Sequence, residues 1–488
     1  MHRGVCWLLR TVRRLLADQR GNAAVIFGFA VMPLVAATGL AVDTVLAYNA
    51  EGQLQKSLDA AGLAAGRAIE QANIEPDARS FFDSNFASAE GLATLTDFDV
   101  DPSDDGSRIT LTATATLPTS FMRVFGHDMM TVRARTVVAR QTTGLELALV
   151  LDITASMLDS SKLTNLKTAT RELLTILYGN RNTVEDLWVA IVPYIASVNV
   201  GRSNMNFLAS NDRARGTGTA FSPDTWYGCV LARSNGYDRT DDPPSTRSFT
   251  SYLYPDVNYG LNGWDNDWGT GRNPQTRKYT TTRNGIAYWE GYGPNAGCPD
   301  PITPLVAEKS TLNTAIDALK PWERGGTIIS EGLVWGWRAI SPRWRGLWSG
   351  SPSQLPLAYN TENMRKVIVL LTDGDNQMLV QSYNGSKISP YNTYVSYSGL
   401  GLSSSAASTT STKNELDART TSVCNNIKAQ AITLYTITFG SAPTSTGQTL
   451  MRNCASRPEY YFHAPTGTTL RSAFQTIGGQ LSSLRIVE

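Results

Sequence analysis

Histidine is scarce in this chain, whose 488 residues include three histidines. Side-chain acid–base catalysis uses histidine most often. The sequence also lacks the G-x-S-x-G, H-E-x-x-H and G-x-x-x-x-G-K-[ST] segments that mark serine hydrolases, zinc peptidases and P-loop enzymes. An Mg²⁺ phosphotransferase with Asp152 as nucleophile would need acidic and lysine partners that Lys162 and Lys366 do not supply convincingly. We therefore predict a protein that is not an enzyme.

Neither sign of charge dominates, because 43 basic residues stand against 42 acidic ones. A nucleic-acid-binding domain usually carries a strong basic excess, so we expect no nucleic acid partner. The length is sufficient for two or three domains and a sizeable core.

A stretch of 22 residues without a charged side chain runs from Gly21 to Val42. As a helix, these residues would span about 33 Å, which matches the hydrocarbon core of a bilayer. Arginines are concentrated before it, and Asp43 follows it. By the positive-inside rule, we expect residues 1–20 to be a cytoplasmic basic segment and residues 21–46 a transmembrane signal anchor.

A cleaved signal peptide is the alternative interpretation of this stretch. Ala36-Ala37-Thr38 or Gly39-Leu40-Ala41 could mimic a small-residue cleavage site. The apolar stretch is longer than the usual signal-peptide core of about 7 to 15 residues. This length favours an uncleaved anchor.

Two modules are expected after the anchor. Residues 47–142 combine helical spacing with alternating strand patterns, which predicts a small α+β stalk or pilin-like module. Residues 143–488 alternate strands and helices, as in a doubly wound α/β sheet. A large insertion rich in Gly, Asn, Asp, Tyr and Trp occupies about residues 201–304. We expect Gln377 to Ser411 to be mobile, because it has few apolar anchors.

Tryptophan and tyrosine are abundant in the insertion, for example Trp226, Tyr227, Tyr252, Trp264 and Trp268. Aromatic side chains among polar neighbours serve recognition surfaces. They also pack a segment that has no core of its own, and we favour this packing role.

Cysteine is rare as well, with five in the chain. Cys6 would lie in the cytoplasm, whereas the other four would face an oxidising compartment, where an even number suggests disulfides. Three pairings are formally possible. We predict Cys229 with Cys298 and Cys424 with Cys454. A zinc site is the rival, but there is no C-x-x-C pair.

Oxygen-bearing side chains follow two predicted strands. Asp152, Thr154 and Ser156 come directly after the apolar run Leu145 to Leu151, and Asp373 follows a second run, Lys366 to Leu371. The carboxyl ends of parallel strands meet at one edge of a doubly wound sheet. The pattern predicts a half-site for a divalent cation. An isolated D-x-T-x-S segment is more often an ordinary Asx or ST turn, but three matching segments in the right order and strand context reverse this preference.

A fifth oxygen-bearing side chain, Thr327, lies between these strands, where Gly325-Gly326-Thr327 precedes an amphipathic helix. Together these segments resemble the metal-ion-dependent adhesion site (MIDAS) of von Willebrand type A domains, which reads D-x-S-x-S, then Thr, then Asp in T-D-G. The resemblance implies the metal ligands Asp152, Thr154, Ser156, Thr327 and Asp373, with Thr154 in place of the usual Ser. It also implies Mg²⁺ or Mn²⁺, which prefer oxygen ligands.

Other segments resemble TadG-like Flp (Tad) pilus assembly proteins, which couple an N-terminal anchor to an extracytoplasmic von Willebrand A domain. The resemblance lies in Arg20-Gly21-Asn22, residues 39–43, Tyr227 to Val230, residues 293–295, Gly332 to Arg338, and Cys424 to Phe439. It implies a single-pass protein of the bacterial inner membrane. The N-terminus would be cytoplasmic and the C-terminal domain periplasmic or extracytoplasmic.

We expect a metal-dependent binding protein that acts in Flp pilus assembly or adhesion. Its partner would be a pilus or envelope protein that offers a carboxylate to the metal. The alternative is a structural scaffold with a vestigial metal site, and a metal-dependent hydrolase is a third hypothesis. The sequence does not specify an oligomeric state.

Overall fold

The computed structural model describes residues 22–67, 71–86, 93–103, 108–139, 144–213, 226–252, 278–283, 286–291, 295, 297–322, 325–383, 386–388 and 392–484. The chain divides into two compact units, with the boundary between Gln141 and Thr142. The predicted basic segment 1–20 and Cys6 lie outside the described residues.

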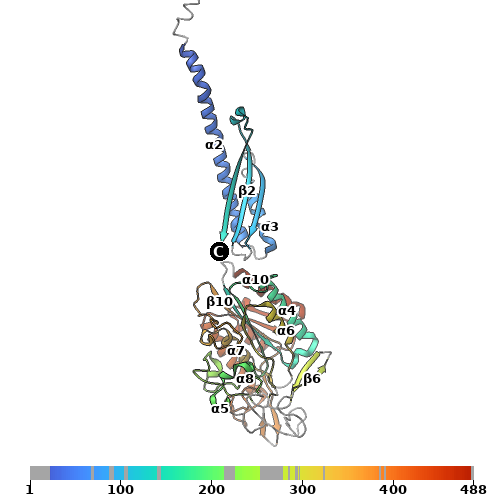
Figure 1. Cartoon of the computed structure of the whole chain (residues 1–488). Helices are drawn as coiled ribbons and strands as arrows, with labels where there is room; N and C mark the ends of the chain where they lie inside the picture. Colours follow the sequence, from blue (N-terminus) through green and yellow to red (C-terminus); the bar gives the residue numbers. More distant parts are fainter. Residues whose placement is uncertain are drawn as a thin grey trace, which may run out of the picture. The chain divides into compact units, whose positions relative to one another are not determined.

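The first unit begins with one long helix, α2 (Asn22–Arg67) (Figure 1). Its N-terminal half presents apolar side chains to the surroundings, with Phe29 77% and Met32 75% exposed. The helix is long and apolar enough to cross a membrane, which fits a single-pass membrane protein. Its C-terminal half instead buries one face at helical spacing, through Ala47, Ala50, Leu54, Leu58, Ala61 and Ala65.

An α+β module packs on that buried face, as expected. It contains α3 (Gln71–Phe86) and the antiparallel sheet β1-β2-β3, formed by β1 (Thr94–Pro102), β2 (Arg108–Pro118) and β3 (Met129–Ala139). Every second residue of β2 is buried, because alternate side chains point to one face of a strand: Ile109, Leu111, Ala113, Ala115 and Leu117. We call residues 47–139 the stalk module.

The second unit is built on a six-stranded sheet of order β15-β14-β10-β4-β5-β8. In chain order the strands are β4 (Gly144–Asp152), β5 (Leu187–Tyr194), β8 (Thr303–Val306), β10 (Met364–Thr372), β14 (Thr433–Phe439) and β15 (Tyr461–Ala464). Numbered one to six, they give the order 3-2-1-4-5-6 of doubly wound sheets. All neighbours pair in parallel except β5 and β8. The predicted von Willebrand A-type fold class is confirmed.

Helices cover both faces of this sheet (Figure 1). On one face lie α4 (Lys162–Tyr178), α6 (Lys309–Ala318) and α10 (Gly467–Leu484); on the other lie α7 (Ile329–Ile340), α8 (Thr409–Ala429) and α9 (Ser445–Cys454). Along β4, Leu147, Leu149 and Leu151 face the first layer, and Ala148 and Val150 face the second. The continuous apolar sequence of β4 is therefore explained by burial on both sides.

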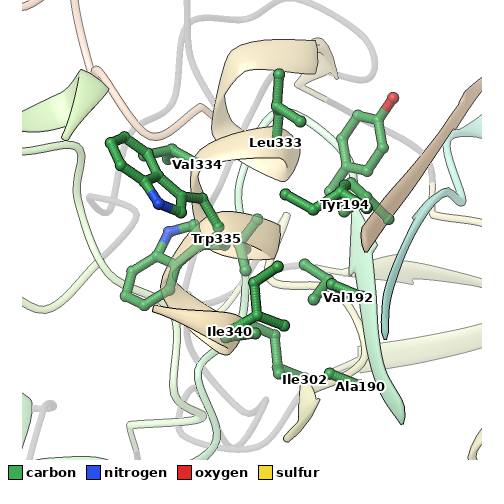
Figure 2. Close-up of a cluster of buried hydrophobic side chains, with 14 of the residues drawn as sticks. Ala190, Val192, Tyr194, Ile302, Leu333, Val334, Trp335 and Ile340 are labelled. Atoms are coloured by element: carbon green, nitrogen blue, oxygen red, sulfur yellow. The ribbon is translucent and has the colours of Figure 1, made fainter. Parts of the chain in front are cut away.

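Helix α7 packs against the sheet, with Leu333 near Tyr194 and Ile340 near Val192 (Figure 2). Two glycines make this approach possible. A Cβ at Gly332 would lie 2.4 Å from the ring of Tyr194, and one at Gly336 would lie 2.4 Å from Val150 Cγ2. Small residues at these two positions thus set the spacing between helix and sheet.

The insertion between β5 and β8 is pinned by the predicted disulfide Cys229–Cys298, and α8 is joined to α9 by Cys424–Cys454. Both predicted pairs are present. Within the described part of the insertion, Trp226 and Tyr252 are each 1% exposed, so the packing role is confirmed for them. Tyr254, Tyr259, Trp264 and Trp268 lie outside the described residues.

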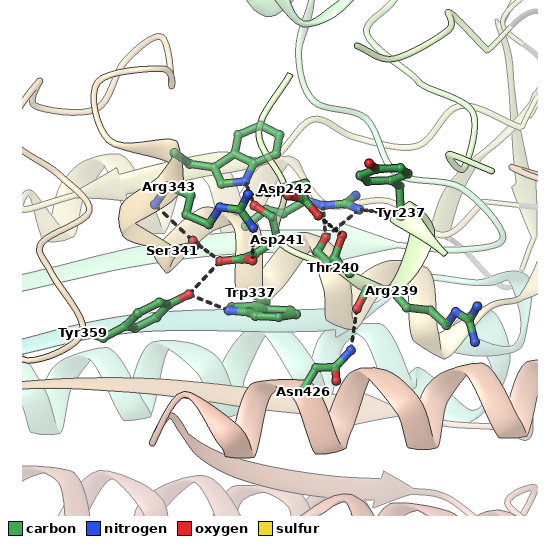
Figure 3. Close-up of polar contacts among 12 residues, drawn as sticks. Tyr237, Arg239, Thr240, Asp241, Asp242, Trp337, Ser341, Arg343, Tyr359 and Asn426 are labelled. Carbon is green, nitrogen blue, oxygen red and sulfur yellow. Dashed lines mark hydrogen bonds and ion pairs between the residues drawn. The ribbon is translucent and has the colours of Figure 1, made fainter. Parts of the chain in front are cut away.

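A network of polar contacts joins the insertion to the segment that follows α7 (Figure 3). The carboxylate of Asp241 accepts hydrogen bonds from Ser341 Oγ at 2.5 Å, Tyr359 Oη at 2.9 Å and Arg343 Nη1 at 3.1 Å. Its backbone carbonyl accepts one from Trp344 Nε1 at 2.8 Å. These bonds satisfy a buried carboxylate, whose exposure is 6%.

The prediction of a mobile segment from Gln377 to Ser411 is wrong for residues 392–408. Tyr394, Tyr397, Leu400 and Ala407 are buried together against α8. A backbone hydrogen bond also joins this segment to the chain that follows β5, because the Thr393 amide donates to the Ala196 carbonyl at 2.9 Å. Tyrosines provide the apolar anchors that the segment otherwise lacks.

Candidate metal-binding site

Strands β4 and β10 lie side by side at the centre of the sheet, with Leu151 opposite Leu371. Asp152 ends β4, and Asp373 follows the last residue of β10. The strand order of the sheet reverses between these two strands, which is the point where doubly wound folds bind ligands. The fold therefore brings both aspartates to the expected edge, and each is 0% exposed.

Four of the five predicted ligands form one hydrogen-bonded cluster. Thr154 Oγ1 donates to Asp152 Oδ1 at 2.6 Å and lies 3.1 Å from Ser156 Oγ. Ser156 Oγ donates in turn to Asp373 Oδ1 at 2.7 Å. We call Asp152, Thr154, Ser156 and Asp373 the oxygen cluster.

The first segment of the cluster also forms a local turn. The Thr154 amide donates to Asp152 Oδ1 at 2.9 Å, and the 3₁₀ helix η3 (Ala155–Ser161) follows. This is the Asx turn of the alternative interpretation. A turn alone does not account for the contact between Ser156 and Asp373, which are 217 positions apart in sequence.

The predicted fifth ligand, Thr327, does not join the cluster. Instead of opening the helix, Gly326–Thr327 forms a short strand, β9, which pairs with β11 (Gln377–Met378) so that Thr327 lies opposite Gln377. In the part of the chain that the structure describes, the Thr327 hydroxyl makes no hydrogen bond to the cluster. Asn376 Oδ1 accepts from the Ile329 amide at 2.9 Å and so ties this loop to the segment after Asp373.

Sequence reasoning did not assign two residues that contact the cluster, and it had set Lys162 aside as a partner of Asp152. Thr372 Oγ1 donates to Asp152 Oδ2 at 2.9 Å. Lys162 Nζ, at the start of α4, lies 2.7 Å from Asp373 Oδ2. Thr372 could have been found as the neighbour of Asp373 in T-D-G, whereas no sequence pattern pointed from Lys162 to a residue more than 200 positions away.

The cluster brings two buried carboxylates together. Burial, and after it the nearby charge of Asp373, raise the pKa of Asp152 to about 7, although hydrogen bonds from Thr154 and Thr372 act in the opposite direction. Burial and the charge of Asp152 also raise the pKa of Tyr194 well above its usual value. Lys162 supplies one positive charge against two buried carboxylates. A divalent cation bound there would favour the ionised form of both carboxylates.

The donor set fits a hard cation. Among the described residues, no group of three or more His, Cys, Asp and Glu side chains lies together, so a site built from nitrogen or sulfur ligands has no support there. Two carboxylates and two hydroxyls in one cluster are instead the ligand types that Mg²⁺ and Mn²⁺ prefer. Asp152, Thr154, Ser156 and Asp373 would hold such an ion.

Residues 21–68 match the Tad family model, described as Flp pilus-assembly TadE/G-like. A search of curated proteins gives no match for the chain.

Several solved structures resemble the chain at low identity. The von Willebrand domain of the type V pili tip protein Mfa5 from Porphyromonas gingivalis is 10% identical with a TM-score of 0.35, and the match covers 70% of this chain and 95% of that one. Proximal thread matrix protein 1 from the mussel byssus is 13% identical with a TM-score of 0.30, over 71% and 47%. Pilus adhesin SpaC from Lactobacillus rhamnosus GG is 9% identical with a TM-score of 0.33, over 79% and 33%.

The chain thus spans about half the length of the mussel protein. The N-terminal segment, residues 21–68, is similar to TadE/G-like Flp pilus-assembly proteins, and the segment that begins at Gly144 folds as a von Willebrand A-type domain.

Proposed function

We propose that this chain is a membrane-anchored, envelope-facing binding protein of Flp/Tad pilus assembly or adhesion. Its von Willebrand A-type domain would bind Mg²⁺ or Mn²⁺ and offer the ion to a carboxylate on a pilus or envelope protein. The match of residues 21–68 to a pilus-assembly family supports the pathway. The apolar half of α2 supports a membrane anchor, and the arginines that precede it favour a cytoplasmic N-terminus, as expected for an inner-membrane protein.

The hydrogen bond from Ser156 to Asp373 carries the metal proposal. It joins the two halves of the site across the centre of the sheet, so the ligands need no large movement to converge. A bound ion would supply positive charge to a partner's carboxylate. Asp152 and Asp373 would hold the ion. Thr154 and Ser156 would complete its coordination shell with hydroxyls. Thr327, on the adjacent loop, is the fifth proposed ligand.

The ion pair between Lys162 and Asp373 supports a second candidate function. An ammonium that neutralises Asp373 in the absence of metal is what a scaffold with a vestigial site would retain. In that case, the stalk module and the insertion would make the useful contacts with the pilus apparatus. The two candidates differ in whether function requires the oxygen cluster.

Substitution in the native host separates them. Asp152→Ala and Asp373→Asn should abolish pilus output if metal-mediated binding is required. Asp375→Asn is the matched control, because Asp375 lies on the same loop but contacts Thr444 at 3.0 Å rather than the cluster. Equal amounts of membrane-bound protein must be shown for all three. Normal pilus output from the first two variants would leave only the scaffold.

A metal-dependent hydrolase is the third hypothesis. It predicts turnover by the purified protein in the presence of Mg²⁺ or Mn²⁺. We propose that a broad substrate screen will detect none.

A further inference from the structure

The hairpin connection between β2 and β3 exposes large apolar side chains at its tip. It contains the 3₁₀ helix η2 (Met122–Phe125), where Val124 is 82% and Phe125 64% exposed. Phe121 and Met129, on either side, are 41% and 53% exposed. An apolar group of this kind on a small module marks a contact surface.

Hydrogen bonds fix the position of the hairpin tip along the axis of α2. The carboxylate of Asp43 accepts hydrogen bonds from the amides of Ser120 at 3.0 Å, Phe121 at 2.9 Å and Met122 at 2.7 Å, and Asp43 is 1% exposed. Gly39 leaves room for the adjoining ring, since a Cβ there would lie 2.5 Å from Phe121 Cβ. The hairpin therefore cannot slide along the helix without losing three charge-assisted hydrogen bonds.

That position coincides with the end of the membrane span. Phe121, Met122 and Phe125 share an apolar pocket with Ala36, Ala37 and Leu40 of α2. Ala36 and Leu40 precede Val42, the last residue of the uncharged run, by about 9 and 3 Å along the helix axis. If α2 spans the bilayer, the tip reaches into the lipid leaflet on the stalk side.

The backbone of the tip suits an apolar medium. Besides the three amides bound by Asp43, those of Val124, Gly126 and His127 donate to the carbonyls of Phe121, Arg123 and Met122 at 3.0 to 3.2 Å. Lipid can satisfy no backbone donors, so a segment that enters it must satisfy them internally. Arg123 is highly exposed beside Asp128, where its long side chain can reach the headgroups.

We propose that the loop 119–128 is a second membrane contact, in which Phe121, Val124 and Phe125 enter the lipid beside α2. The partner of this apolar surface is the lipid bilayer, because the exposed apolar surface of the loop is continuous with that of the membrane-spanning half of α2. Two contacts would fix the rotation of α2 and the height of the stalk module above the membrane. The proposal rests on the membrane anchoring of α2.

Fluorescent labels on the full-length chain in phosphatidylethanolamine–phosphatidylglycerol vesicles test this. Single cysteines replace Val124, Phe29 or Val137 in a Cys6→Ser background, where the other four cysteines form disulfides. Val124 is mostly exposed, so its replacement leaves the core intact. Val137 is 49% exposed but lies about 26 Å further along β3 from the hairpin.

The label at Val124 should show blue-shifted emission and quenching by nitroxide lipids, like the label at Phe29 and unlike the one at Val137. A label at Val124 that behaves like Val137 while Phe29 is quenched overturns the second contact and leaves the span intact. Loss of lipid quenching at both Val124 and Phe29 overturns the span itself, and the proposal with it.

Discussion

Lys162 Nζ and Asp373 Oδ2 form a buried ion pair at 2.7 Å, with side-chain exposures of 12% and 0%. The lysine therefore neutralises one carboxylate of the oxygen cluster when no metal is bound. Any divalent ion that uses Asp373 must compete with this ammonium. Gly440 leaves space for the lysine side chain, because a Cβ at position 440 would lie 3.0 Å from Lys162 Cε.

Replacing Lys162 by Met should tighten divalent cation binding by at least about tenfold, or about 1.4 kcal/mol, because the competing charge is gone. The same change should destabilise the metal-free protein by about 1 to 3 kcal/mol, because Asp373 loses its partner. Calorimetry and chemical denaturation measure the two effects. Lys167→Met is the control, since Lys167 Nζ on the same helix donates to the Asp317 carbonyl instead. Unchanged metal affinity in the Lys162 variant would contradict the competition.

Glu331 predicts a pH dependence of stability. It is 2% exposed and accepts from Trp335 Nε1 at 2.8 Å, and burial raises its pKa from 4.5 to about 7. The folded state therefore holds this proton more tightly, so its stabilising contribution is complete below pH 4.5 and is lost as the pH rises through 7. The loss amounts to at most about 3 kcal/mol.

Glu331→Gln should remove that part of the pH dependence. Free energies of unfolding at several pH values between 4 and 8 measure it, and Glu459→Gln, whose side chain is 59% exposed in the parent chain, is the control. Parallel curves for the wild type and the Glu331 variant would show that the pKa of Glu331 is the same in the folded and unfolded protein.

We predict opposite effects for two glycine substitutions, one in the closely packed helix α7 and one in α10. Gly332→Ala should destabilise the domain by about 1 to 3 kcal/mol, because the new Cβ overlaps the ring of Tyr194. Gly479→Ala, in α10, has no atom within 4 Å of its added Cβ and should stabilise by about 0.4 to 1 kcal/mol. Thermal denaturation compares them, and a neutral Gly332 variant would mean that α7 can shift.

The disulfide Cys424–Cys454 closes a loop of 30 residues between α8 and α9. Replacing both cysteines by Ala should cost about 3 to 4 kcal/mol, since the unfolded chain gains conformational freedom. Denaturation curves of the wild type with and without reductant, compared with the double variant, measure this. A reductant-insensitive wild type that matches the double variant would show that the bond does not form.

Much of the fold follows from local pattern. The strand at Leu145 to Leu151 was predictable because a segment buried on both faces is apolar throughout, and the strand at Lys366 to Leu371 for the same reason. The convergence of Asp152 and Asp373 followed from the general rule for parallel strand ends. Strand β5 ends at Tyr194, because the chain turns there and the Ile195 amide donates to the Ser197 carbonyl.

The rest of the fold and of the site depends on contacts between residues that are far apart in sequence, which no local pattern encodes. The contact between Lys162 and Asp373 requires the start of α4 to lie beside the end of β10. The strand formed by Gly326 and Thr327 arises from pairing with Gln377 and Met378, which overrides the helical pattern beside it. The order of residues 392–408 comes from burial of Tyr394 and Tyr397 against α8.

Calorimetric titration of the full-length chain with Mg²⁺ and Mn²⁺ tests the metal proposal most directly. We predict one saturable site per chain, lost in Asp152→Ala and Asp373→Asn and kept in Asp375→Asn. Absence of binding to the wild type, or equal binding by all four proteins, would contradict a metal site at the oxygen cluster.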